Sequence, residues 1–382
     1  MSLRHLLLSL WLYAAFLSSS AAEFLPGGSR PPVERIVLVY IDASNSMPRG
    51  ADDYIKLAGH LDDDGIYDDS FFTHVLFLGI RSASGGSFET GTATQEDWMA
   101  WGDGLFGPEG ELEQLEAAVR LLCEELGQIR MGVIVMIPRP SPDIDARTRE
   151  QQVEDYVNSI VSRFRASPFS RLDLSGFYWM SETSTGDDQI IRSTAALIRE
   201  LGLKLYWIPY FQATGVERWR ELGFDSAMVQ PNFAFYSSGL ERFEAVDSRV
   251  RGSGLGVEME LPMYSRNPEV ADWRESFLLY MWASAEYGWE GLERISYYYG
   301  NDFVRMSETP ETKSLYDMVY MHAKGQLTTS SLPTEVDDAF RAFQSRQDTK
   351  AIAAWTIVVT SFILLGFMLI VILRSRGARG GP

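Results

Sequence analysis

Eight short apolar runs recur along the chain, and most are rich in β-branched and aromatic residues. They cover residues 36–41, 74–80, 132–137, 172–180, 203–211, 227–233, 256–261 and 295–299. Most are nearly continuous rather than alternating in polarity, which is typical of strands buried on both faces of a parallel sheet. Such strands need a covering layer on each side, so the runs predict a fold in which helices enclose the sheet.

Helical patterns separate the apolar runs. In residues 112–126, leucine and valine recur at spacings of three and four, and Gly127 follows as a predicted C-cap. Residues 153–164 and 190–198 carry similar stripes. Eight strands alternating with helices over residues 35–325 predict a (β/α)8 (TIM) barrel. An open, doubly wound sheet is the alternative, because the sequence period does not separate the two folds.

The N-terminus has the pattern of a secretory signal peptide, predicted over residues 1–22. Arg4 gives a charged start, residues 6–17 are mostly apolar, and small residues follow where cleavage would occur. An uncleaved N-terminal anchor is the alternative. Residues 23–34 are then a linker to the predicted barrel.

The C-terminal region predicts a membrane anchor. Residues 351–373 carry no charge and would extend about 34 Å as a helix, enough to cross a bilayer. Lys350 precedes this segment and three arginines follow within residues 374–382. Because positive residues stay inside, this tail is predicted to be cytoplasmic and the barrel extracellular. Residues 326–350 are predicted to form a stalk, part flexible and part helical.

Composition excludes several classes of function. The chain has 34 Lys+Arg against 52 Asp+Glu, a net charge of −18, which argues against nucleic acid as a partner. A single cysteine excludes an intramolecular disulfide framework and a thiolate zinc site. The four histidines form no HExxH pattern. We therefore expect neither a metal nor a cofactor.

Three glutamates stand where a (β/α)8 barrel carries its chemistry, toward the carboxyl ends of the strands. Glu258 and Glu260 are two apart on the seventh predicted strand, so both are expected to face the barrel axis. Glu182 follows the fourth strand. Buried carboxylates are costly unless they are hydrogen-bonded, paired or used. For Glu258 and Glu260 the alternative to a catalytic role is an ion pair with Arg139 or Arg266, and for Glu182 it is an ordinary charge at the N-terminus of a helix before Asp187 and Asp188.

Two carboxylates facing each other across a barrel mouth suit hydrolysis of a glycosidic bond. One protonates the leaving oxygen, and the other attacks the anomeric carbon or activates water. We predict Glu182 as the proton donor and Glu260 as its partner. Aromatic rings near the same strand ends would stack on sugar rings and amides would bind hydroxyls, although packing in the core is the alternative for the rings. The side chains predicted to bind substrate are Asp42, Tyr178, Trp179, Trp207, Tyr210, Gln230, Asn232, Glu258, Tyr298 and Asp302.

Several segments also resemble the domain-of-unknown-function family 4855 (DUF4855). They keep one order over about residues 35–325: residues 74–78, 97–98, 133–138, 176–179 with Glu182, 207–210, 223–225 with 230–232, and 258–260. This resemblance implies a barrel-like enzyme domain of polysaccharide hydrolase type, without an established substrate. The chain is also similar to clan A glycoside hydrolases, which place an acid/base glutamate after strand four and a nucleophile on strand seven. Glu182 and Glu260 match those places, but Ser181 stands where that clan usually has asparagine, which leaves a retaining outcome in doubt.

Two other functions stay open on the sequence. Residues 42–46 read DASNS, which resembles the start of the metal-ion-dependent adhesion site of von Willebrand A domains, where Asp and Ser oxygens help to hold Mg²⁺. A barrel that binds glycans without cleaving them is the other possibility. Acidic residues between 62 and 69 are expected to form a solvated loop, with weak Ca²⁺ binding as the alternative.

Overall fold

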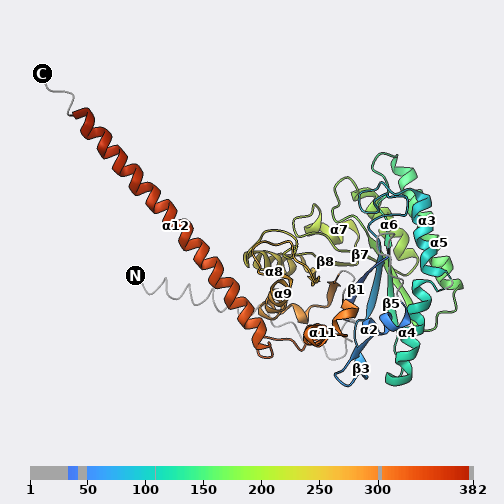
Figure 1. Ribbon diagram of the computed structural model, residues 1–382. Helices are drawn as coiled ribbons and strands as arrows, with labels where there is room; N and C mark the ends of the chain where they lie inside the picture. The colour runs from blue at the N-terminus through green and yellow to red at the C-terminus, as the bar shows by residue number, and fades with distance from the viewer. Residues whose placement is uncertain (1–32, 42–49, 108, 300–302, 378–382) are drawn as a thin grey trace, which may run out of the picture. The chain divides into compact units, whose positions relative to one another are not determined.

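The computed structural model describes residues 33–41, 50–107, 109–299 and 303–377, the last nine without their side chains. Parallel strands form a closed barrel in the order β1-β10-β9-β8-β7-β6-β5-β4 (Figure 1). The strands are β1 (Glu34–Tyr40), β4 (His74–Leu78), β5 (Met131–Ile137), β6 (Leu172–Trp179), β7 (Lys204–Trp207), β8 (Ser226–Val229), β9 (Gly256–Glu260) and β10 (Arg294–Tyr298). The closed ring confirms the predicted (β/α)8 barrel and excludes the open doubly wound sheet.

Each of the eight apolar runs overlaps one barrel strand, but two strands end four residues before their runs do. β7 ends at Trp207 and β8 at Val229, whereas the apolar runs continue to residues 211 and 233. Pro209 and Pro231 lie just beyond these ends. Because proline has no N–H to donate to a neighbouring strand, it limits the ladder at both places. The residues past the strands are thereby free to form the mouth of the barrel.

Helices cover the outside of the barrel and connect its strands (Figure 1). They are α2 (Ala51–Ala58), α3 (Gln95–Phe106), α4 (Glu111–Leu126), α5 (Ala146–Ala166), α6 (Asp188–Glu200), α7 (Trp219–Leu222), α8 (Glu241–Ser253), α9 (Trp273–Tyr287), α10 (Phe303–Met306), α11 (Pro310–Ala323) and α12 (Thr334–Gly377), with 3-10 turns η1 (Val216–Arg218) and η2 (Trp289–Gly291). The predicted stripe of α4 is buried, and Gly127 ends this helix at φ +85° with its N–H donating to Cys123 O. Glycine adopts that conformation at no steric cost.

A polar cluster closes the amino-terminal end of the barrel. Glu34 on β1 is buried and accepts hydrogen bonds from Lys204 Nζ at 2.7 Å and Tyr206 Oη at 3.1 Å. Ser226 on β8 donates to its second oxygen at 2.9 Å. Burial alone would raise the pKa of Glu34, but Lys204 outweighs it and the pKa is lowered. The interior is therefore filled at this end, which leaves the carboxyl ends of the strands for a ligand.

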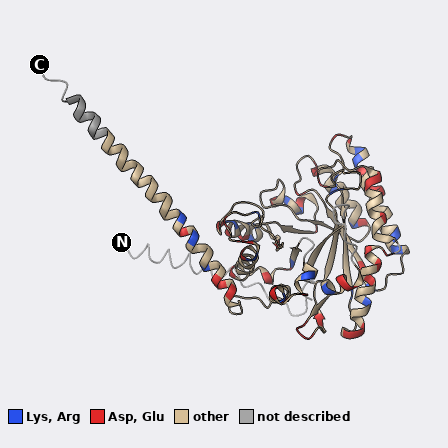
Figure 2. Ribbon diagram, viewed as in Figure 1, with Lys and Arg blue, Asp and Glu red and all other residues tan. Residues whose placement is uncertain are grey.

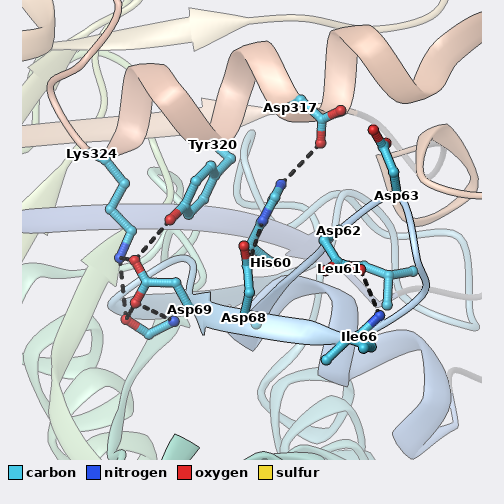
Figure 3. A network of polar contacts seen from close by, with 12 residues as sticks. His60, Leu61, Asp62, Asp63, Ile66, Asp68, Asp69, Asp317, Tyr320 and Lys324 are labelled. Carbon is cyan, nitrogen blue, oxygen red and sulfur yellow. Dashed lines mark hydrogen bonds and ion pairs between the residues drawn. The ribbon is translucent and has the colours of Figure 1, made fainter.

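A small hairpin, β2 (Gly59–Leu61) with β3 (Tyr67–Ser70), interrupts the connection from β1 to β4 and carries the acidic residues expected in a solvated loop. Figure 3 shows that Asp68, through His60, and Asp69, through Tyr320, are connected to α11 instead. His60 lies between Asp68 and Asp317, at 2.8 and 2.9 Å, and its ring stacks on Tyr320 at 3.8 Å. Asp69 pairs with Lys324 at 2.8 Å. The hairpin is thus fastened to the last helix of the barrel by charge.

Helix α12 has two unlike parts. Before residue 369 its charged residues all lie in 334–350, and residues 351–368 carry none (Figure 2). Val336 and Phe343 in the first part are fully buried, while the side chains of 351–368 are exposed. Within the described residues, α12 is the helix long and apolar enough to cross a membrane. The predicted signal peptide, most of the predicted linker and the end of the tail lie outside the described residues.

We expect the contacts of His60 with Asp68 and Asp317 to stabilise the fold in a pH-dependent way. Burial alone would lower the pKa of His60, but its bonds to Asp317 and Asp68 outweigh that effect and raise the pKa. A raised histidine pKa gives stability that is complete below pH 6.5 and lost as pH rises through the folded-state value. His60→Phe should keep the ring stack and lose about 2 kcal/mol at pH 5.5, and less at pH 8.5. Urea unfolding of the detergent-solubilised chain at both pH values measures this, and an equal loss at both would contradict it.

Candidate active site

Two glutamates of β9 point into the barrel. Glu258 and Glu260 are 3% and 1% exposed, and their neighbours in the register of β10 are Ser296 and Tyr298. The residue between them, Met259, is also fully buried but on the opposite face of the strand. The two-residue period of the strand therefore delivers two carboxylates to one enclosed space.

Glu260 is held by two donors from outside its own strand. The Tyr280 hydroxyl, on α9, donates to Oε2, and Asn232 Nδ2, just beyond β8, donates to Oε1 at 3.3 Å. Tyr280 is itself fixed, because the backbone N–H of Phe233 donates to its hydroxyl oxygen at 3.2 Å. A carboxylate that accepts hydrogen bonds on both oxygens is oriented and helped to carry negative charge.

Glu182 lies in the loop that follows β6, and its backbone is anchored from β7. The indole N–H of Trp207 donates to Ser181 O at 2.8 Å, directly before Glu182 in the chain. The Glu182 side chain is partly exposed and accepts a hydrogen bond from Gln230 Nε2 at 2.9 Å. The loop thus presents a partly accessible carboxyl group at the barrel mouth.

An amide pair links the two carboxylates. Gln230 binds Glu182, Asn232 binds Glu260, and Asn232 Nδ2 also donates to Gln230 Oε1 at 3.2 Å. Asn232 has φ +56°, in the left-handed region that asparagine tolerates better than most residues. Residues other than glycine that are held in that region cluster at functional sites, where the surrounding structure maintains the less favourable backbone. Glu182 and Glu260 consequently converge on one hydrogen-bonded chain.

Burial raises the pKa values of all three carboxyl groups, and neighbouring carboxylates raise them further. Burial raises the pKa of Glu182 to about 7 and that of Glu260 to about 8, although Gln230 and Tyr280 act in the opposite direction. Burial also raises the pKa of Glu258 well above its ordinary value, with further increases from Glu260 and Glu182. Near neutral pH the three groups share protons, so a protonated and an ionised carboxyl can coexist in the mouth.

Glu258 lies deepest and is the least satisfied. Its Oε1 has no hydrogen-bond partner among the described residues. Tyr40 on β1 packs edge-on against Tyr298 at 5.6 Å, and the charge of Glu258 contributes to raising the pKa of the hydroxyls of both Tyr40 and Tyr178. A buried carboxyl with an unpaired oxygen costs least when it keeps its proton, so Glu258 is expected to stay neutral in the folded chain.

The aromatic residues predicted to bind substrate fall into two groups, because alternate residues of a strand face opposite sides of the barrel wall. Trp179 and Trp207 are fully buried on the outer face, where the Trp207 ring stacks on Phe224 at 4.7 Å, so neither offers a ring face to the mouth. Tyr178 and Tyr298 take the inner face instead. Tyr298 is half-buried, and its hydroxyl lies 3.0 Å from that of Tyr264. A continuous aromatic run does not reveal this parity, because both faces of the strand are apolar.

The remaining predicted residues have varied positions. Tyr210 is half-buried and pairs with Gln230 through a single β-bridge. Asp42 and Asp302, and with Asp42 the DASNS motif, lie outside the described residues. Arg139, proposed above as an ion-pair partner for the glutamates, binds Asp187 at 2.7 Å instead. In the described part of the chain, neither Glu258 nor Glu260 forms an ion pair, and no three-residue group of His, Cys, Asp and Glu is placed to hold a metal.

Two neighbours of the site escaped the sequence reading. Tyr280 is on a helix whose buried residues surround it on all sides, so its pattern indicates only core. Glu89, in the chain after β4, is half-buried and its charge raises the pKa of Glu182. The sequence could have indicated Glu89 by its position after β4, because a (β/α)8 barrel carries its site residues beyond the carboxyl ends of its strands.

Comparisons with known proteins give one family match and low-scoring similarities to solved structures. Residues 35–321 match the family described as domain of unknown function DUF4855. Among solved structures, the chain is similar to a GH18 chitinase catalytic domain from the fern Peteris ryukyuensis, with 12% identity, TM-score 0.43, and coverage of 75% of this chain and 99% of that one. It is similar to the Group IV chitinase of Ostrinia furnacalis, with 10% identity, TM-score 0.44, and coverage of 76% and 99%. A search of curated proteins finds no match.

We expect Glu258→Gln to stabilise the protein above neutral pH. A carboxyl whose folded-state pKa is raised keeps its proton on folding, so its contribution to stability falls as pH rises above about 4.5. The slope is about 1.4 kcal/mol per pH unit until the folded-state pKa is reached. The amide has no charge to bury, so the variant should unfold at a higher temperature than the parent chain at pH 8 and nearly the same one at pH 4.5.

Exposed Glu124 provides the control, because Glu124→Gln should leave the pH dependence of the unfolding temperature unchanged. A Glu258→Gln protein that is less stable than the parent at pH 8 would show that the deep carboxyl is ionised and satisfied.

Proposed function

The chain belongs to the DUF4855 family, a family of unknown function, and we propose that its barrel is a glycoside hydrolase that cleaves a polysaccharide with Glu182 and Glu260. The observation that carries the proposal is the hydrogen-bonded chain from Glu182 through Gln230 and Asn232 to Glu260. It draws two carboxyl groups from strands on different sides of the mouth toward one space. Tyr298, half-buried on the inner face, supplies a ring against which a sugar would pack, whereas Tyr178 is only 3% exposed and offers no free ring face.

Their surroundings suit the two glutamates to different tasks. Glu260 is almost fully enclosed and receives donors on both oxygens, which suits the carboxylate that attacks the anomeric carbon or activates water. Glu182 receives one donor and is partly exposed, and its pKa near 7 suits the acid that protonates the leaving oxygen. Because the pKa of Glu260 is about 8, the last proton of the pair lies mostly on Glu260 in the free chain, so these roles require that proton to lie on Glu182 when substrate is bound. The bond between the anomeric carbon and that oxygen breaks as the proton moves to the oxygen.

The proposal includes a membrane anchor. Residues 351–373 of α12 would cross the bilayer, with residues 374–382 in the cytoplasm, the barrel outside the cell, and residues 1–22 removed on export. The exposed, uncharged side chains of 351–368 support this arrangement. The enzyme would then act on an external polysaccharide close to the membrane.

Replacement of either glutamate tests the chemistry. With the full chain in detergent and a panel of neutral, amino and acidic polysaccharides, Glu182→Gln and Glu260→Gln should each lower the release of reducing ends by about 10²–10⁴-fold. Binding of the cleaved polysaccharide should persist, and Glu124→Gln should keep full activity. Binding without cleavage by the parent chain would favour the glycan-binding alternative, and full activity in both variants would reject the assignment.

Aryl glycosides with an acidic leaving group distinguish the two roles. Such a group departs without a proton, so Glu182→Ala should retain most activity on it while losing activity on polysaccharide, and the basic limb of its pH–rate profile should disappear. Glu260→Ala should be inactive on both substrates. The opposite pattern would assign the proton to Glu260.

Protease treatment of intact cells tests the anchor. With an epitope tag after Pro382, external protease should remove the barrel and leave a short tagged fragment in the membrane, because the tail is protected inside. Permeabilised cells provide the control, since there the tag should also be digested. A tag that is lost from intact cells would contradict the orientation.

A further inference from the structure

The charged part of α12 is packed against the barrel. We call residues 334–350 the docked segment. Phe340 stacks on Trp282 of α9 at 4.1 Å, and Lys350 pairs with Glu269 at 2.7 Å. Arg274 of α9 pairs with Glu335 at 2.8 Å. The predicted stalk is therefore a helix that shares a core with the barrel over this length.

One side chain of the docked segment reaches toward the candidate active site. Phe343 is fully buried, and its ring lies 6.2 Å from that of Phe233, centroid to centroid. Phe233 in turn packs edge-on against Tyr280 at 6.0 Å. Tyr280 donates to Glu260, so two aromatic contacts connect the docked segment with a catalytic carboxyl.

Phe233 is linked to both residues that donate hydrogen bonds to Glu260. Its backbone N–H binds the Tyr280 hydroxyl, and the preceding residue, Asn232, binds Glu260 directly. Asn232 keeps a left-handed backbone that its surroundings must maintain. A change in the packing of the Phe233 ring would therefore disturb both hydrogen bonds to Glu260 together.

We infer that Phe343 is a positioning residue for Glu260, and that the docked segment belongs to the catalytic unit; the inference rests on the proposed function. Phe343 fills the space behind Phe233, which holds Asn232 and Tyr280 in place. Without it, Glu260 keeps its position in the strand but loses the alignment of its donors. Phe340 offers a matched control, because it is on the same segment but packs on Trp282 rather than on Phe233.

Kinetics of the full chain in detergent test the inference. Phe343→Ala should lower kcat about tenfold or more with little change in KM, because a small misplacement of a reacting group is costly. The limb of its pH–rate profile that reports Glu260 should move to higher pH, since the bond from Tyr280 lowers the pKa of Glu260. Phe340→Ala should leave kcat and that limb unchanged. Equal effects of the two variants would overturn the inference.

A double variant separates positioning from general loss of packing. Tyr280→Phe removes the hydrogen bond itself, so Phe343→Ala added to it should cost much less kcat than Phe343→Ala alone. Fully additive losses would mean that Phe343 does not act through Tyr280. If Phe343→Ala does not fold, Phe343→Leu, which leaves a smaller gap, provides the same comparison against Phe340→Leu.

A measurement without substrate distinguishes this inference from the proposed function. The pH at which Glu260 titrates follows from the difference in unfolding temperature between each protein and the same protein with Glu260→Gln. Phe343→Ala should raise that pH and Phe340→Ala should not. An unchanged titration in Phe343→Ala would reject the positioning role, whereas a parent chain that cleaves no polysaccharide would reject only the hydrolase.

Discussion

The interior of a closed barrel has no solvent face, and this constraint governs the chemistry of the chain. A strand directs alternate residues to opposite sides, so a carboxylate at every second position of β9 must enter the barrel. Glu258 and Glu260 are both nearly inaccessible as a result. Carboxyl groups so placed resist ionisation and repel one another, which raises their pKa values toward the range where acid and base roles are both available. The fold itself thus raises the pKa values of these side chains.

Burial of these carboxyl groups lowers the stability of the folded protein, and hydrogen bonds from neutral donors offset part of that loss. The amide groups of Gln230 and Asn232 and the hydroxyl of Tyr280 each supply a donor, and no described cation pairs directly with Glu258 or Glu260. Neutral donors orient a carboxylate without suppressing its pKa as an arginine would. The opposite end of the barrel shows the contrast, because Lys204 lowers the pKa of Glu34 there. One end is stabilised by charge pairing, whereas the carboxyl groups at the other end keep raised pKa values.

The sequence predicted the barrel well because the signal for buried parallel strands is strong and local. All eight runs overlap a barrel strand, and the glutamate pair of β9 could be oriented from its spacing alone. The sequence did not predict contacts between segments that are far apart in the chain. Nothing near Trp207 indicates that its indole binds Ser181 O rather than a sugar, and Tyr280 on α9 has the pattern of a core residue. The charged residues of 334–350 indicated a stalk, although their partners are on α9 and in the chain just before it.

The continuity of α12 has a mechanical consequence. The same helix begins among the aromatic residues of the barrel and runs without interruption into its apolar turns. A domain on a flexible linker samples a volume set by the length of that linker, whereas a helical bracket rises about 1.5 Å per residue and transmits rotation as well as distance. In a bilayer, such a bracket would fix the height and tilt of the mouth above the lipid. Under the proposed function, long glycan strands would have to pass the mouth, since the barrel could not swing out to meet them.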